Sequence, residues 1–455
     1  MTQRRDTFHA TSSTRVGTAI ALFTRDLRVD DNPVLIAAQR AGAAVVPLFV
    51  VDEHILARFG APNRACFLAA ALSELDTELR SLGSHLVIRR GDTVTEADRV
   101  ADEIGADSVH VAADVSAYSV RRAERLRTRL ARRDCALHTY DTSITAAAPG
   151  ALRPAGGRDH FAVFTPYFRR WVDEYRRDAL ARPRLLRTPP VAGDRLPVAD
   201  DICSGPTSPL LSVGGATTGR KLLREWVSTS ISDYDFRGDA LDADATSHLS
   251  PYLHFGCLSP VQILEATDLS TVGGLAFARQ LAWRDFHHQL LAARPRAAWQ
   301  DYRSRAVVWR ADPDAVTAWQ QGRTGIPVVD AGMRQLLAQG WMPGRARLIA
   351  ASFLTKSLGI DWRVGARHFL RWLVDADLAN NQLNWQWVAG TGTDTRPNRT
   401  LNPLRQAIRF DPEGEYVRRW VPELATLPGA SIHRPWRQHI DNATYPAPIC
   451  EFAGM

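Results

Sequence analysis

The first third of the chain alternates short, β-rich apolar runs with helical patterns, and this alternation restricts the fold more than any other feature. Parallel strands need a crossover between them, and helical crossovers cover both faces of the sheet. We therefore predict a doubly wound parallel sheet of α/β class. The expected strands are Thr18–Thr24, Ala44–Val51, His85–Arg89, Ser108–Ala112 and Ala136–Tyr140. The expected helices between them are Pro33–Ala41, Pro62–Leu82, Glu96–Ile104 and Tyr118–Arg133.

Beyond Thr218 the strand-like pattern is absent and only helical periodicity remains. This change predicts an α/β domain followed by an all-α domain, joined by a segment rich in Pro, Gly and Ser that contains one short helix, Pro166–Arg177. The expected division is a disordered tail at 1–15, an α/β domain at 16–140, a linker at 141–219 and a helical domain at 220–455. The expected helices of the second domain are Leu223–Ser230, Pro260–Thr267, Ala276–Ala293, Pro313–Gln321, Val328–Gln339, Ala346–Leu358, Gly365–Val374 and Asp377–Trp387.

Composition excludes several classes of protein. With 45% hydrophobic and 23% charged residues the chain is neither disordered nor fibrous. No run approaches the roughly 18 apolar residues of a membrane helix, and the N-terminus lacks a signal-peptide core, so we expect a cytoplasmic protein. The five scattered cysteines form no CxxC pair, which argues against a disulfide framework or a metal site. We expect a monomer.

Charge points weakly to nucleic acid. Lysine and arginine together number 56, aspartate and glutamate 49, and the pI is about 9.4, as suits a polyanionic partner. Almost all the basic residues are arginine, which can also reflect genome composition. Charge alone leaves the question open.

Tryptophan is concentrated in the second domain, where 12 of the 13 residues lie after position 220. Core packing explains most of them. Polar residues stand among them, however, and buried polar groups need partners that a planar, polar cofactor could supply. Gln280, Trp283, Arg284 and His287 recur at helical spacing, so one face would present an aromatic plate flanked by an amide and a guanidinium. A solvated helix face is the alternative for this stripe.

Hydroxyl side chains precede an expected helix start in the segment Thr246–Pro251. Helix N-termini favour phosphate, because unpaired N–H groups and the positive end of the helix dipole meet there. Simple N-capping is the alternative, and the local sequence does not choose between them. The first domain lacks GxGxxG and GxxxxGK[ST] loops, so the usual phosphate-binding loops are absent from it.

These residues lie within longer blocks of sequence that resemble a known family. The chain resembles photolyases and cryptochromes in ordered blocks over nearly its whole length: TRDLRVDDNPVL (Thr24–Leu35), TSHLSPYLHFG (Thr246–Gly256), QLAWRDFHH (Gln280–His288), GIPVVDAGMRQLLAQGWM (Gly325–Met342), ASFLTKSLGIDWRVG (Ala351–Gly365), DADLANNQLNWQWVAGTGTD (Asp375–Asp394), RPNRTLNP (Arg396–Pro403) and FDPEGEYVRRWVPEL (Phe410–Leu424). The resemblance implies an antenna domain joined to a helical domain that binds FAD.

The resemblance also implies roles for single residues. Those expected at the cofactor's phosphates and ribityl chain are Tyr234, Thr246, Ser247, Leu249 and Ser250. Those expected around the flavin ring and adenine are Arg284, Arg347, Asp375 and Asp377, with Arg347 and Asp375 ion-paired, and Asn381 at flavin N5. Trp385, Trp362 and Trp309 match a relay that passes electrons from the surface to the flavin. Lesion and DNA contacts match Gln280, Trp283, Arg345, Leu348, Trp387 and Arg399.

The implied activity is light-driven repair of cyclobutane pyrimidine dimers in DNA, and a cryptochrome-like photoreceptor without repair is the alternative. Dimer photolyases usually have Glu where this chain has Gln280, and Pro343, Gly344 and Leu348 also depart from their lesion pocket. Enzymes for (6-4) photoproducts place histidines at the positions of Gly344 and Leu348, which argues against that lesion. For the antenna pigment, Ser116, Ala117 and Trp299 lack the folate-associated residues, so 8-hydroxy-5-deazaflavin is preferred over folate, with an empty site as the rival.

Overall fold

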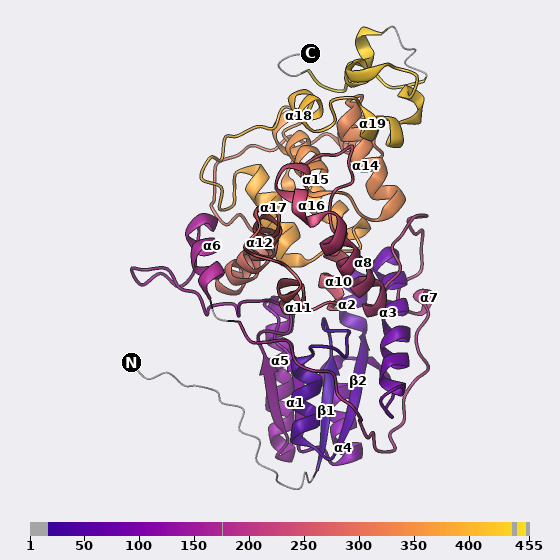
Figure 1. Ribbon diagram of the computed structural model, residues 1–455, viewed down its shortest axis with the longest axis vertical. Coiled ribbons are helices and arrows are strands. Elements are labelled where there is room, and N and C mark those ends of the chain that lie inside the picture. Colours follow the sequence, from indigo (N-terminus) through magenta and orange to yellow (C-terminus); the bar gives the residue numbers. More distant parts are fainter. Residues whose placement is uncertain (1–16, 175, 439–443, 452–455) are drawn as a thin grey trace.

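The computed structural model describes residues 17–174, 176–438 and 444–451. The expected disordered tail at 1–15 lies outside these residues. The N-terminal sheet with its helices forms one end of the molecule, and the helices of the second half form the other (Figure 1). No helix in the described ranges is both long and apolar enough to cross a membrane.

The sheet is parallel throughout, with strand order β3-β2-β1-β4-β5. This confirms the predicted doubly wound architecture. The third strand begins two residues later than expected, because Leu86 donates its backbone N–H to the Asp76 carboxylate at 2.8 Å instead of joining the ladder. The strands are β1 (Thr18–Phe23), β2 (Ala44–Asp52), β3 (Val87–Gly91), β4 (Ser108–Ala112) and β5 (Ala136–Tyr140).

Helices cover both faces of the sheet, as continuous apolar strands require. Side chains of β1 alternate between two cores: Phe23 packs in the core that contains α1 and α3, and Leu22 in the core that contains α4 and α5. Helix α2 was not expected. It forms because Asp52 at the end of β2 accepts the N–H groups of His54 and Ile55 at 3.0 and 3.2 Å. The helices are α1 (Pro33–Ala41), α2 (Glu53–Phe59), α3 (Pro62–Arg80), α4 (Thr93–Ile104) and α5 (Ala117–Leu130).

The second half is helical, as predicted. The expected helix Ala346–Leu358 is divided, because α15 ends at Ser352 and residues Phe353–Ser357 form a π-helical turn. The helices are α8 (Ala216–Thr229), α9 (Tyr234–Arg237), α10 (Ser250–Phe255), α11 (Pro260–Glu265), α12 (Val272–Ala293), α13 (Pro313–Gln320), α14 (Pro327–Gln339), α15 (Gly344–Ser352), α16 (Trp362–Trp372), α17 (Leu378–Ala389), α18 (Pro403–Phe410) and α19 (Glu415–Trp420).

The connection between the two halves is packed against them. It contains α6 (Phe164–Asp173) and the short α7 (Ala199–Ile202), and α8 starts at Ala216, inside the range expected for the linker. Helix α6 lies beside α12 (Figure 1). The fully buried Trp171 of α6 donates its indole N–H to the Asp285 carboxylate of α12 at 3.0 Å. This segment therefore belongs to the helical layer.

One hydrophobic core runs through both halves. It joins residues of β1, α1 and α3 to residues of α10, α11 and α12. Phe67 of α3, for example, stacks on Phe255 of α10 with ring centroids 4.7 Å apart. The sheet domain and the helical domain are thus packed as one body.

Gly256, at the end of α10, allows this contact between the halves. Its φ of +71° is left-handed, and an added Cβ would lie 2.0 Å from the backbone carbonyl oxygen of Arg25. We expect Gly256→Ala to lower the free energy of unfolding by roughly 2–4 kcal/mol, because both strain and a backbone collision arise. Urea unfolding measures this. Gly344→Ala is the control, since an added Cβ there meets nothing within 4 Å; equal losses in the two variants would contradict the argument.

Candidate functional site

Hydroxyl groups gather at the start of α10, but they do not cap the helix. The N-cap residue Leu249 offers no side-chain cap, and none of the described hydroxyls accepts an N–H from the first turn. Ser250 Oγ accepts the indole N–H of Trp341 at 3.1 Å, and within the described ranges Ser247 Oγ accepts only the N–H of Leu249, at 3.4 Å. The buried hydroxyl of Thr246 has no hydrogen-bond partner among the described residues. Capping therefore does not explain the segment, and the Thr246 hydroxyl is available to a ligand.

Arg347 of α15 and Asp375, before α17, form a bidentate ion pair. Arg347 donates through both terminal nitrogens, at 3.0 and 2.8 Å, to the two oxygens of a nearly buried carboxylate. Its Nε donates to the carbonyl of Met342 at 2.9 Å. The predicted ion pair is confirmed. A planar fork of this kind is rigid, and it fixes α15 relative to the start of α17.

Asp377 is engaged by the protein itself. It accepts the backbone N–H of Asn380 at 2.8 Å and so caps α17. It is also ion-paired with Arg25 of the sheet domain, and its carboxylate lies 3.4 Å from His288 Nε2. Burial alone would raise the pKa of Asp377, but His288 and Arg25 hold it well below its usual range. Asp377 is a charged, structural group at the contact between the two halves.

Arg284 is likewise held by backbone. Its guanidinium donates to the carbonyl oxygens of Ile144 at 2.5 Å and Leu253 at 3.3 Å. Burial lowers its pKa, although the nearby Asp377 carboxylate opposes that effect. Contacts of Arg284 and Asp377 with a flavin remain predictions, since each side chain already has partners in the protein.

Asn381 lies one turn into α17 and is partly exposed. Its amide NH₂ donates to the carbonyl of Ala366 and to Gln382 Oε1, both at 3.1 Å. Its own carbonyl oxygen accepts no hydrogen bond from the described residues. The side chain is therefore fixed by its nitrogen and leaves its oxygen to a ligand.

Trp385, one turn beyond Asn381, is buried in a tight aromatic cluster. An added Cβ on Gly365 would lie 2.1 Å from its indole ring, so only glycine leaves room for it. The ring packs edge-on against Phe369 at 4.9 Å and against Trp319 at 6.0 Å. The sequence did not single out Trp319 as a neighbour of Trp385, because an apolar residue in an expected helix gives no functional signal.

The other two relay candidates lie in the same hydrophobic cluster as Trp385. Trp362 is fully buried, and its indole N–H donates to the Asp301 carboxylate at 2.9 Å. Trp309 is partly buried. Neither ring makes a direct ring contact with Trp385 in the described part of the chain. The relay order Trp385, Trp362, Trp309 therefore stays a prediction.

The residues expected at a lesion are on packed helices. Gln280 is exposed and Trp283 is partly buried on α12, while Trp387 of α17 and Leu348 of α15 are also partly buried. Helix α17 contacts both α12 and α15. The structure thus arranges these four side chains on neighbouring elements.

The two arginines expected at phosphates differ. Arg345 is ion-paired with Asp239, and its guanidinium lies over the ring of Phe410 at 4.3 Å. The side chain of Arg399 is exposed and makes no hydrogen bond or ion pair with the described residues. Arg399 can bind a phosphate directly, whereas Arg345 would first have to leave Asp239.

Tyr234 of α9 is partly buried against aromatic rings. It lies edge-on to Trp226 at 5.4 Å and to Phe277 at 5.7 Å, and burial raises its pKa. The expected contact with the cofactor's phosphates remains a prediction.

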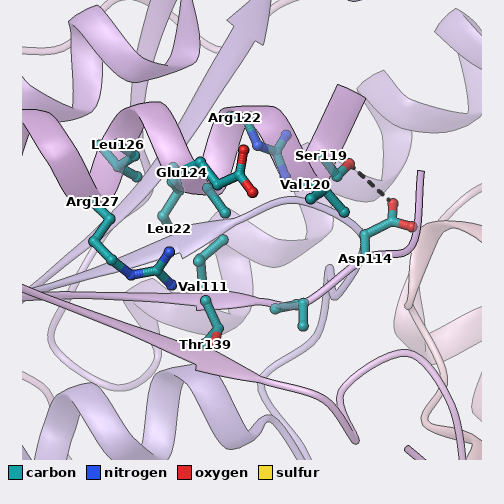
Figure 2. A pocket seen from close by; sticks show the side chains of 13 residues that line it. Leu22, Val111, Asp114, Ser119, Val120, Arg122, Glu124, Leu126, Arg127 and Thr139 are labelled. Carbon is teal, nitrogen blue, oxygen red and sulfur yellow. Dashed lines mark hydrogen bonds between the residues drawn. The ribbon is translucent and has the colours of Figure 1, made fainter. Parts of the chain in front are cut away.

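A cavity of about 210 Å³ lies elsewhere, between α5 and the sheet, and Figure 2 shows its lining side chains. Asp114, Ser119, Arg122 and Thr139 line it, together with apolar residues of β1 and β4. None of the predicted cofactor or lesion residues does. Its volume is below the roughly 300–1,000 Å³ of typical cofactor sites, so we assign it no ligand.

Comparison with known proteins identifies the family. Residues 19–186 match the family described as DNA photolyase, and residues 277–454 match the FAD binding domain of DNA photolyase. A deoxyribodipyrimidine photo-lyase of Streptomyces griseus is 55% identical over 441 residues, which cover 96% of each chain. This chain belongs to the photolyase/cryptochrome family.

Solved structures of the family agree in fold. A bacterial class III photolyase from Agrobacterium tumefaciens superimposes with a TM-score of 0.88 at 31% identity, covering 98% of this chain and 96% of the other. A cryptochrome from Synechocystis sp. PCC6803 gives the same TM-score of 0.88 at 29% identity, covering 97% and 98%. The family fold therefore serves both photolyases and cryptochromes.

The residues of the helical domain fit FAD. Its pyrophosphate and ribityl chain need hydrogen-bond donors, and the unpartnered Thr246 hydroxyl beside the uncapped start of α10 offers them. Its ring needs polar partners at its edge, and the free carbonyl oxygen of Asn381 is one. The family identity and these unsatisfied atoms support the same ligand.

Removing the Thr246 hydroxyl tests this fit. Thr246→Val keeps the shape of the side chain, and we expect it to weaken FAD binding about threefold to tenfold, the effect of one hydrogen bond. Reconstitution of the flavin-free protein, followed by fluorescence, measures this.

Thr391→Val is a matched control, because the Thr391 hydroxyl is also buried without a described partner but is not among the expected cofactor residues. Its FAD affinity should stay unchanged. Unaltered FAD affinity in Thr246→Val, or equal losses in both variants, would remove Thr246 from the site.

Proposed function

We propose that this protein is a light-dependent DNA repair enzyme that splits cyclobutane pyrimidine dimers with FAD as its cofactor. The observation that supports this most strongly is the 55% identity with the Streptomyces griseus photo-lyase across 96% of both chains. The match to the cryptochrome of known structure is lower, at 29% identity. Repair is therefore favoured over signalling.

The helical domain would hold the cofactor through three groups. Thr246, Ser247 and Ser250 at the start of α10 would bind its phosphates and ribityl chain, with Leu249 against them. The ion pair of Arg347 and Asp375 would border the ring, as would the carbonyl oxygen of Asn381. FAD, when bound, reduced and excited by light, supplies the electron that opens the dimer.

Other residues would receive the flipped dinucleotide. A dimer inside a duplex cannot reach the flavin, so it must leave the base stack, and its bases need flat apolar surfaces. Trp283 and Trp387 would supply them, while Gln280, exposed one turn before Trp283, can hydrogen-bond to a base edge. Trp385 is buried beside Asn381 on α17, which suits an electron donor to the flavin.

Repair is tested directly. Reduced protein is mixed with an oligonucleotide containing one thymine dimer, exposed to blue light, and the recovery of thymine absorbance is followed. We expect light-dependent recovery. A flavin-containing protein that repairs no dimer would instead support the photoreceptor alternative.

The positions that would bind folate bear on the identity of the antenna pigment. We propose 8-hydroxy-5-deazaflavin rather than folate. Ser116 accepts the N–H of Ser119 at 3.2 Å as the cap of α5, and Trp299 stacks on Phe59 at 6.1 Å. These two positions are therefore occupied by packing and capping groups. They lack the Asn-Glu pair and the Lys that the resemblance places at these positions in folate-using relatives.

Gln280→Glu tests the departure from the usual lesion pocket. An ionised carboxylate accepts a hydrogen bond from thymine N3–H more strongly than a neutral amide does. We expect dimer DNA to bind more tightly by about 1 kcal/mol, roughly fivefold, at pH 7.5. Titration of labelled dimer DNA in the dark measures this. Gln321→Glu adds the same charge at an exposed position beyond α13 and should give no gain; an equal gain in both variants would contradict a lesion contact.

Arg399 is expected to bind one phosphate. Loss of one such contact should reduce the slope of log affinity against log salt concentration by about 0.9. We expect this from Arg399→Ala with duplex DNA between about 50 and 200 mM salt. Arg132→Ala removes an exposed arginine from the sheet domain and should keep the parent slope. An unchanged slope in Arg399→Ala would show that Arg399 does not meet the DNA backbone.

A further inference from the structure

Trp283 is in face-to-face contact with a residue of the connecting segment. Its ring lies on that of Phe164, from α6, with centroids 3.7 Å apart and planes only 5° from parallel. The ring of Phe286 lies nearly perpendicular to both, with its centroid 5.5 Å from that of Trp283 and 5.7 Å from that of Phe164. Phe164 is buried, whereas Trp283 keeps part of its surface exposed.

Neighbouring side chains of α6 and α12 hold Phe164 in this position. The guanidinium of Arg279 lies over the rings of both Phe164 and Phe168, at 5.0 and 4.9 Å. Helix α6 itself is anchored to α12 by the hydrogen bond between Trp171 and Asp285. Phe164 therefore cannot move away from Trp283 without disturbing buried contacts.

The geometry is not one that the two rings prefer by themselves. Aromatic pairs favour offset or edge-to-face arrangements with centroids about 4.5–7 Å apart, because their faces repel electrostatically. The surrounding packing therefore imposes the parallel stack. Without Phe164, the indole would be free to tilt into the space left behind.

We propose that Phe164 is a positioning residue for lesion recognition, which fixes the plane of Trp283 so that its exposed surface can stack on a flipped pyrimidine dimer. This rests on the proposed function. Base–aromatic stacking needs parallel planes, and a ring that is fixed before binding loses less conformational entropy when the base arrives. The segment expected to serve as a linker thereby contributes to substrate selection.

The test compares affinities in the dark for a duplex with one thymine dimer and for the same duplex undamaged, using the full chain with FAD bound. We expect Phe164→Ala to weaken binding of dimer DNA about tenfold, within the range for one lost base stack. Binding of undamaged DNA should change less than about twofold, because it depends on charge. Phe168→Ala is the matched control: Phe168 stacks on Phe164 at 5.6 Å but makes no described ring contact with Trp283, so dimer preference should persist.

A double-mutant cycle separates positioning from general packing. In a Trp283→Ala background, Phe164→Ala should cost no further dimer affinity. An equal loss in both backgrounds, or a parallel loss of dimer binding, undamaged binding and FAD content, would overturn the proposal. If Phe164→Ala does not fold, Phe164→Leu, which fills the space without a flat ring, takes its place; unchanged dimer preference in it would also overturn the proposal.

The parent protein distinguishes the two hypotheses. If it shows no preference for dimer DNA, the proposed function fails and the positioning role falls with it. If the parent prefers the dimer and the Phe164 variants keep that preference, only the positioning role is wrong.

Discussion

The organisation of this molecule depends on the charge of Arg25. This residue follows β1, Asp114 follows β4, and the two lie 3.3 Å apart at the carboxyl edge of the sheet. In doubly wound folds that edge, between neighbouring strands whose connections run in opposite directions, is where ligands usually bind. Here Arg25 instead reaches Asp377, the cap of α17 in the other half. Arg25 is partly buried, and losing it would remove a cation from both carboxylates; breaking a buried ion pair typically costs about 3–5 kcal/mol.

Because Asp377 begins α17, its ion pair with Arg25 also fixes the position of the residues along that helix. Its cap is Asp377, Asn381 follows one turn later and Trp385 a further turn. Trp387, which we expect at the lesion, stands two residues before the helix ends at Ala389. A helix is a stiff rod, so residues that would bind the flavin, donate to it and stack on a base keep fixed spacings. The contact between Trp385 and Gly365 fixes the rod against α16, because nothing larger than a hydrogen atom fits there.

Periodicity was enough to predict the sheet, the helical half and most element bounds, since alternation and crossover length are local properties of the sequence. It missed α2, α9, α18 and α19 and placed β3 two residues early. Side-chain carboxylates, those of Asp52 and Asp76, decide where α2 and β3 begin. Family motifs proposed Trp283 and Arg345 but not their neighbours. Phe164, the neighbour of Trp283, and Asp239, the partner of Arg345, each lie more than 100 residues away in sequence. No pattern around Phe164 or Asp239 predicts these contacts.

The core shared between the halves also constrains how the chain folds as it is made. Phe67 of α3 is covered by Tyr252 and Phe255 of α10, at 5.3 and 4.7 Å, yet these rings follow the last strand by more than 100 residues. At about 5–20 residues per second, the finished sheet domain waits for several seconds or more before the outer, apolar side of α3 is covered. On the ribosome the sheet domain therefore exposes apolar side chains that α10 will later cover. During that interval its exposed surface is a natural substrate for chaperones, so slower translation before α10 would lengthen the period in which nascent chains can aggregate.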